Sequence, residues 1–151
     1  MKNKLFFCLA ISFFLSISLM SQSTSRGTLE IRFIDIRNSK GKIAIGINTM
    51  KEGWPRQPQL GFDWNKENLV NGVFTVKVPD LPYGTLAISA LDDENGNLEM
   101  DMFLGIPKEG FGFSMDPPFR LSAPRFEECS FRLNQPNQQI TIRFRYAGKG
   151  K

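Results

Sequence analysis

The segment from Asp93 to Asp101 contains the oxygen-bearing side chains from which hard-cation sites are built. Ca²⁺ takes about six to eight oxygen ligands, and a loop that binds it must double back within a few residues. With Asp93 at position 1 of a calcium-loop frame, oxygen side chains also occupy positions 3, 5 and 9, and position 7 supplies a backbone carbonyl. The candidate calcium ligands are therefore Asp93, Asn95, Asn97, Glu99 and Asp101.

The same segment also has a purely structural interpretation, because two positions depart from the calcium-loop pattern. Position 6, which is glycine in such loops, is Leu98, and position 12, which is a bidentate glutamate, is Leu104. Asn95–Gly96 favours a two-residue type I′ turn. Residues 98–102 would then return as a strand opposite residues 86–90. The alternative to a calcium site is a plain acidic hairpin.

Two carboxylates from this region could also serve as the acid and base of a glycan-cleaving enzyme. The available side chains are Asp93, Glu99, Asp101 and Glu109. The chain has no histidine, which excludes Ser-His and Cys-His nucleophiles and imidazole metal ligands. We therefore expect a protein without catalytic activity, with a carboxylate-dependent glycan-acting enzyme as the alternative.

Length and charge narrow the function classes further. The 151 residues suffice for one domain with a hydrophobic core and are too few for two. The formal net charge of +4 is unevenly spread, since residues 92–116 hold seven acidic side chains and one basic one, whereas residues 120–151 hold seven basic and two acidic ones. The acidic segment and the low net charge argue against nucleic acid as a partner.

The N-terminal segment is typical of a secretory signal peptide. Lys2 and Lys4 precede an apolar stretch over 5–20, which is short for a membrane span of about 20 residues. We expect cleavage near Ser21, no transmembrane span after its removal, and an exported protein that is periplasmic, held at the outer surface or secreted. Cys129 is then the single cysteine, so no internal disulfide forms and its thiol is expected to be buried.

The rest of the chain alternates apolar and polar residues with a period of two, which is typical of β-strands. The predicted strands cover residues 29–33, 43–47, 74–78, 86–90, 129–133 and 140–146. Asn38–Gly41 suits a hairpin between the first two. The pattern predicts an all-β fold, an antiparallel β-sandwich of six to seven strands that is immunoglobulin-like or transthyretin-like, with a closed barrel as the alternative. The expected organisation is a signal peptide over 1–21, a linker over 22–27, the sandwich over 28–146 and a basic tail over 147–151.

Two long irregular stretches interrupt this pattern, at residues 52–68 and 101–125. Loops of this length in a compact domain are functional or are packed down by their own aromatic side chains. The candidate ligand contacts in them are Trp54, Trp64, Phe111 and Phe113. Their alternative role is to close the ends of the sandwich.

Several motifs occur in an order that resembles one bacterial family. They are Leu81-Pro-Tyr-Gly-Thr85, Asp93-Glu-Asn-Gly-Asn97, Gly105-Ile-Pro-Lys-Glu-Gly-Phe-Gly-Phe-Ser114 and Pro124-Arg-Phe-Glu-Glu128. Together they resemble a family of exported bacterial proteins known only as a domain of unknown function, number 2141, over roughly residues 28–146. The resemblance implies an exported β-domain and carries no activity. This chain has Leu98 where the family-like motif has glycine, and Asp92 where it has histidine.

These observations together favour an exported, non-catalytic β-sandwich domain with a binding or structural role in the cell envelope. Its expected partner is another envelope protein or a glycan. The acidic loop adds calcium as the candidate cofactor.

Overall fold

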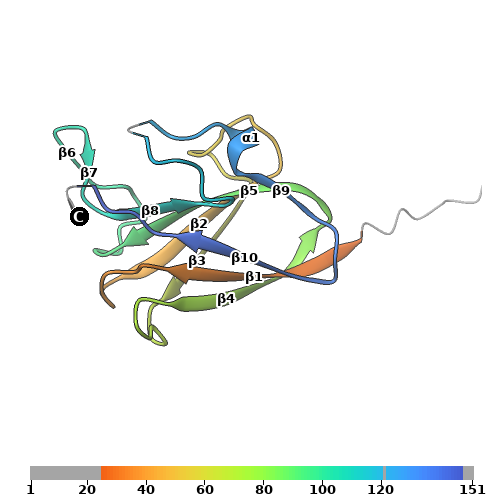
Figure 1. Cartoon of the computed structure of the whole chain (residues 1–151), viewed down its shortest axis with the longest axis horizontal. Coiled ribbons are helices and arrows are strands. Elements are labelled where there is room, and N and C mark those ends of the chain that lie inside the picture. The colour runs from red at the N-terminus through yellow and green to blue at the C-terminus, as the bar shows by residue number, and fades with distance from the viewer. Residues whose placement is uncertain (1–24, 121, 148–151) are drawn as a thin grey trace, which may run out of the picture.

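A computed structural model describes residues 25–120 and 122–147 (Figure 1). The predicted signal peptide over 1–21 and residues 148–151 of the predicted tail lie outside the described residues. The first strand begins at Arg26, within the segment that was expected to be a linker over 22–27.

The described chain is built from strands, with one helical turn. In chain order the elements are β1 (Arg26–Ile34), β2 (Lys42–Asn48), β3 (Leu60–Asn65), β4 (Phe74–Pro82), β5 (Gly84–Asp93), β6 (Met102–Phe103), β7 (Ile106–Pro107), β8 (Gly110–Phe113), α1 (Phe126–Cys129), β9 (Ser130–Leu133) and β10 (Asn137–Arg143). One sheet has the order β10-β1-β4, the other has the order β3-β2-β5-β8 with β9 also paired to β5, and β6 pairs with β7. Neither large sheet closes into a barrel within the described residues, so the predicted all-β sandwich is confirmed.

The core lies between the two large sheets, which form two layers in Figure 1. Alternate residues of each strand point inward because successive side chains of a strand face opposite sides of the sheet. The largest fully buried apolar side chains include Leu29, Ile31, Phe33, Ile43, Ile47, Val78, Leu86, Ile88 and Ile142. Burial of this apolar surface is the main contribution to stability. Cys129 is also fully buried with a free thiol, as the sequence predicted.

Two details of the topology differ from the expected antiparallel sandwich. The strand pair β1–β10 is parallel, whereas the other strand pairs of the two large sheets are antiparallel. Asn38–Gly41 does not join a hairpin, because β1 and β2 belong to different sheets. Ile36, in the segment that connects β1 to β2, is only 5% exposed and extends the core where the chain passes from one sheet to the other.

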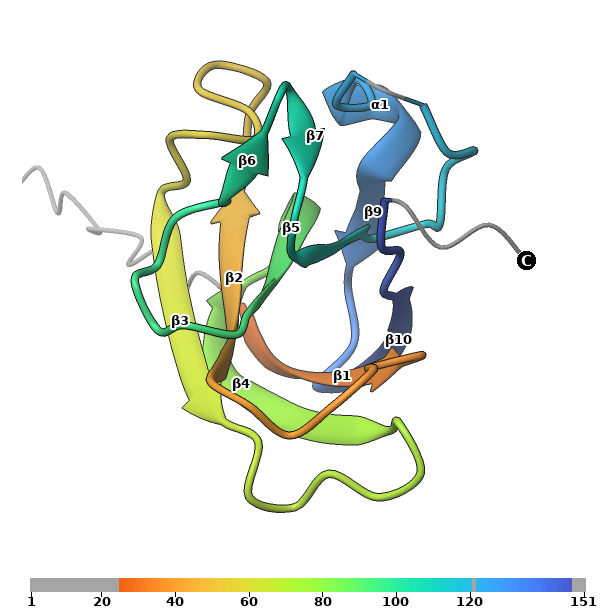
Figure 2. The same cartoon turned by 90° about the vertical axis from the view of Figure 1, so that its left-hand side faces the viewer.

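The two stretches predicted as irregular loops each contain a strand of the five-stranded sheet. β3 lies in the first and pairs with β2 from Lys42 to Ile47. β8 lies in the second and pairs with β5 from Ser89 to Asp92. The loop that precedes β3, the β6–β7 hairpin and α1 gather on the outer side of the five-stranded sheet (Figures 1 and 2).

Candidate functional site

The two outer faces of the sandwich differ in chemistry. The outer face of the three-stranded sheet carries mainly charged and polar side chains, namely Glu30, Arg32, Thr75, Lys77, Gln139, Thr141 and Arg143. On the outer face of the five-stranded sheet the ion pair Lys42–Asp63 lies at one end of β2 and β3, and the other positions over the middle of the sheet are small or apolar, namely Ala44, Gly46, Gly61, Ser89, Leu91, Phe111 and Phe113. Since an antiparallel sheet that faces water alternates apolar and polar residues, the second face is built for contact with something other than bulk water.

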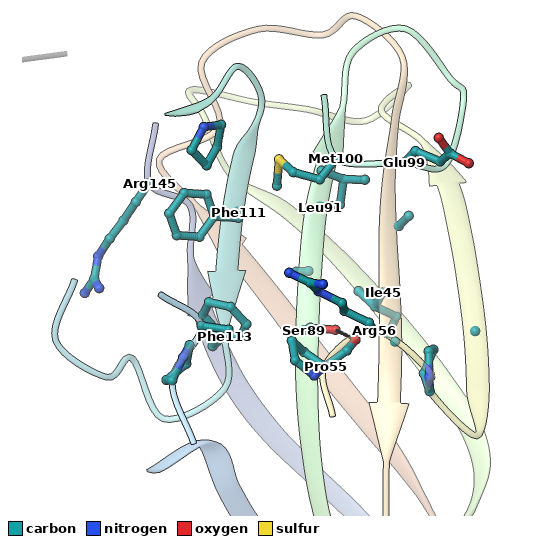
Figure 3. Close-up of a pocket in the computed structure, with 18 of the residues that line it drawn as sticks. Ile45, Pro55, Arg56, Ser89, Leu91, Glu99, Met100, Phe111, Phe113 and Arg145 are labelled. Carbon is teal, nitrogen blue, oxygen red and sulfur yellow. Dashed lines mark hydrogen bonds between the residues drawn. The ribbon is translucent and has the colours of Figure 1, made fainter. Parts of the chain in front are cut away.

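This face is the floor of a groove with a volume of about 840 Å³ (Figure 3). Three parts of the chain form its walls: the loop over 49–59, the segment over 94–109 that contains the β6–β7 hairpin, and the residues over 114–120 and 122–125. Volumes of about 300–1,000 Å³ with an apolar lining are typical of small-molecule sites.

Proline stiffens the walls of the groove. Six of the nine prolines line it, namely Pro55, Pro58, Pro107, Pro117, Pro118 and Pro124. A fixed backbone φ reduces the freedom that a wall loses when a ligand binds, so these loops favour a preformed site. Gly46 allows one wall to approach closely, because a Cβ at this position would lie 2.9 Å from the Pro58 ring.

The charged side chains at the groove are mostly committed to partners in the protein. The carboxylate of Asp63 lies 2.8 Å from the Lys42 ammonium. Arg120 pairs with Glu128 at 2.9 Å. The guanidinium of Arg145 pairs with Asp116, donates to the Pro117 carbonyl oxygen at 2.6 Å, and points away from the groove in Figure 3.

Two of the predicted aromatic contacts line the groove and two do not. Phe111 and Phe113 project from β8 onto its floor. The indole Nε1 of Trp54 donates to the Pro124 carbonyl oxygen at 2.9 Å, and its ring lies 5.9 Å from that of Phe113, so Trp54 ties two walls together behind the lining. Trp64 faces the core side of β3 and stacks on Phe62, with ring centroids 6.0 Å apart.

The acidic loop closes on itself through hydrogen bonds. Asp93 is fully buried, and its carboxylate accepts from the backbone N–H groups of Gly96, Asn97 and Leu98 at 2.8, 3.1 and 2.9 Å. The side-chain amides of Asn95 and Asn97 donate to Asp101 at 2.8 and 3.3 Å.

The Glu109 carboxylate also accepts hydrogen bonds from backbone N–H groups of the acidic loop. It accepts from the backbone N–H of Glu94 at 2.9 Å and from that of Asp101 at 3.2 Å. Glu99 is exposed and lines the groove. Within the described residues, no group of three or more acidic or cysteine side chains is arranged to hold a metal ion. Calcium at this loop stays a prediction.

The acidic segment does not form the predicted returning strand. Residues 94–101 have no strand structure, and β5 pairs instead with β2, β8 and β9. The reason is that the Asp93 carboxylate accepts hydrogen bonds from the backbone N–H groups of the residues that follow it. These bonds turn the chain away from β5 before a type I′ hairpin can form.

A buried polar cluster, which sequence reasoning missed, lies next to this loop. The ammonium of Lys66 contacts Asp92, and both side chains are fully buried. Asp92 also accepts from the Tyr146 hydroxyl, and the guanidinium of Arg37 lies 4.5 Å above the Tyr146 ring. Burial raises the pKa of the Asp92 carboxyl above its usual value, although hydrogen bonds from Lys66 and Tyr146 oppose this. The cluster joins β5 to the segment after β3 and to the C-terminal end of the domain.

The groove itself was also missed, although the sequence carries a signal for it. Ala44, Gly46 and Ser89 stand at the water-facing positions of predicted strands, where polar or charged residues were expected. Small residues at these positions make the floor concave between higher walls. Arg56, which also lines the groove, stands between Pro55 and Gln57 in a stretch that gave no indication of where its side chain points.

Comparison with known proteins confirms the resemblance noted from the motifs. A family model described as "Uncharacterized protein conserved in bacteria (DUF2141)" matches residues 31–141. No curated protein and no solved structure matches the chain. In the part of the chain that the structure describes, no helix combines the length and apolar character needed to cross a membrane.

Proposed function

The chain belongs to the bacterial family of uncharacterized proteins DUF2141, and we propose that it is a non-catalytic binding domain whose site is the groove on the five-stranded sheet. The observation that carries the proposal is the apolar outer face of this sheet, set against the charged outer face of the other. The basic and apolar start of the sequence supports the further proposal that the domain is exported and acts in the cell envelope.

The ligand that this groove suits best is a small apolar molecule. A concave volume of about 840 Å³ is the size of a small-molecule site, whereas a protein partner needs a broad and flatter surface. The groove offers a ligand apolar contact and few hydrogen-bond donors, through the side chains of Phe111, Phe113, Leu91 and Met100. In this proposal a small apolar ligand takes the place of the glycan or envelope protein expected from the sequence.

The arrangement of the acidic side chains supports a non-catalytic role. Glycan hydrolysis needs one carboxyl group free to donate a proton and a second free to attack or to activate water. Of the four candidate carboxylates, Asp93 and Glu109 are instead occupied by five backbone N–H groups between them. Asp101 accepts from two asparagine amides, which leaves Glu99 without a second free carboxylate among these four. The role of Asp93 and Glu109 is to fix the wall of the groove.

Binding of the uncharged fluorophore N-phenyl-1-naphthylamine tests the proposal. Its emission rises in an apolar site, so titration of residues 22–151 should give a saturable signal. The variant Gly61→Phe should block the groove, since a Cβ at Gly61 meets nothing nearer than the Ile45 carbonyl oxygen at 3.9 Å. We expect the dissociation constant to rise about tenfold or more, equivalent to about 1.4 kcal/mol.

Two further variants make the result specific. Ala44→Phe fills the same floor from β2 and should also weaken binding, whereas Thr141→Phe adds an equal side chain to the outer face of the other sheet and should not. Folding of each variant is checked by its unfolding midpoint. The proposal is wrong if the fluorophore does not bind, or if both groove variants bind it as well as Thr141→Phe does.

A further inference from the structure

Arg56 occupies a position in the groove that differs from that of every other charged side chain there. Figure 3 shows its side chain lying across the floor above β5, between Ser89 and Leu91. Within the described residues Arg56 makes no ion pair and no side-chain hydrogen bond. A guanidinium that lies over an apolar floor without a carboxylate partner is a ready site for an anion.

The backbone on both sides of Arg56 is anchored, so its position is a property of the fold. Before it, Trp54 is held by the Pro124 carbonyl oxygen, and the Pro55 carbonyl oxygen accepts from the Ser89 hydroxyl at 3.4 Å. After it, the Gln57 N–H donates to the Gly53 carbonyl oxygen at 2.6 Å, and Pro58 rests on Gly46. The loop therefore holds the base of the Arg56 side chain at the edge of the floor.

The other charges at the groove do not compete for this position. Arg120 and Arg145 are paired with Glu128 and Asp116. Asp63 is paired with Lys42. Glu99 lies on the wall, and in Figure 3 its carboxylate is turned away from the Arg56 guanidinium. Arg56, which is exposed at the edge of the apolar floor, is thus the one positive charge at the groove that has no ion-pair partner among the described residues.

We propose that the groove binds an amphipathic carboxylate, with the acid group on the Arg56 guanidinium and an aliphatic tail along Leu91, Met100 and the two phenylalanines of β8. This inference rests on the proposed function, because it names the ligand class of the same site. A guanidinium binds a carboxylate through two parallel hydrogen bonds, which fix the position of the acid group as well as its charge. The tail gains by burying its apolar surface against the floor.

Competition with the bound fluorophore tests this ligand class. Dodecanoate, dodecanol and dodecyltrimethylammonium share a twelve-carbon chain and differ in head-group charge, and each is used below its micellar concentration. We expect dodecanoate to displace N-phenyl-1-naphthylamine at about one tenth of the dodecanol concentration or less, since a charge-assisted pair contributes about tenfold or more. Dodecyltrimethylammonium should be the weakest of the three.

Variants of the arginine identify the source of any preference. Arg56→Gln should remove the advantage of dodecanoate over dodecanol, measured as the ratio of the two displacing concentrations in the same variant. Arg56→Lys should keep part of it, because an ammonium retains the charge without the paired geometry. Arg32→Gln removes an exposed arginine from the other outer face and should change nothing.

The outcomes separate this inference from the proposed function. If the fluorophore binds but dodecanoate and dodecanol displace it equally, the carboxylate assignment is wrong and the apolar groove stands. The assignment is also wrong if Arg56→Gln keeps the full preference for the acid. If neither the fluorophore nor any of the three amphiphiles binds, both the groove and its ligand class are overturned.

Discussion

Replacing Lys66 by methionine should lower the free energy of unfolding by about 3–5 kcal/mol. Methionine keeps an unbranched apolar stem, so the main change is the loss of the ammonium that contacts the fully buried Asp92. The carboxylate then keeps only the Tyr146 hydroxyl as a side-chain donor among the described residues. A loss of this size is a large part of the 5–15 kcal/mol that is typical of a whole domain.

Urea unfolding of residues 22–151 measures the effect. The midpoint of the transition is compared between variants whose free energy of unfolding falls with urea at the same slope. Lys42→Met is the matched control, because Lys42 pairs with Asp63 on the surface, where both side chains are 39% exposed. Screening by water makes such a pair nearly neutral, and the control should leave the midpoint unchanged. The double variant Lys66→Met/Asp92→Asn should lose less than the sum of the two single variants, because each single variant leaves the other group without its buried partner.

The pH dependence has a definite sign. Burial raises the pKa of the folded Asp92 carboxyl, so its stabilising contribution is complete below the unfolded pKa and is lost as pH rises through the folded pKa. Without Lys66 that pKa rises further, and the deficit of Lys66→Met should therefore grow as pH rises from the ordinary carboxyl pKa through the raised pKa of Asp92. A deficit as small as that of Lys42→Met, or one that does not change with pH, would refute this reasoning.

Two other properties are open to direct test. Burial raises the pKa of the Cys129 thiol to about 12. A thiol-specific disulfide reagent at neutral pH should therefore react with the urea-unfolded protein and leave the native protein unmodified. Rapid stoichiometric reaction of the native protein would contradict this prediction. With the predicted Ca²⁺ bound at the acidic loop, the melting temperature in Ca²⁺ should exceed that in EDTA by several degrees, and Asp101→Ala should abolish the rise. Equal melting temperatures in Ca²⁺ and EDTA would contradict the calcium prediction.

The sandwich could be predicted from the sequence because its inward positions are strongly apolar. Leu29, Ile31 and Phe33 alternate with charged residues, and such a pattern has only one satisfactory arrangement on a two-faced sheet. β8 escaped prediction because its pattern is inverted, with glycine inward and phenylalanine outward. A Cβ at Gly110 would lie 2.3 Å from the Tyr146 ring, and one at Gly112 would lie 2.6 Å from the Arg143 carbonyl oxygen, so the close approach of the two sheets requires glycine there.

The candidate site was predicted only in part, for a different physical reason. Local spacing located the acidic loop, but it could not show that the Asp93 carboxylate turns inward to backbone amides. The aromatic residues of the two long stretches were recognised, yet their division between groove and core depends on strand register. Arg56 owes its place to contacts made by Trp54 and Pro58 with distant segments, which spacing along the chain does not encode.

The most direct test of the binding site is to map the bound fluorophore by amide chemical-shift perturbation in solution. Saturating N-phenyl-1-naphthylamine should shift the amides of Ala44, Ser89 and Phe111 on the groove floor and leave those of Thr75 and Thr141 on the other outer face in place. This pattern is the result that the proposed function predicts. Shifts confined to the three-stranded sheet, or no shifts at saturating fluorophore, would contradict it.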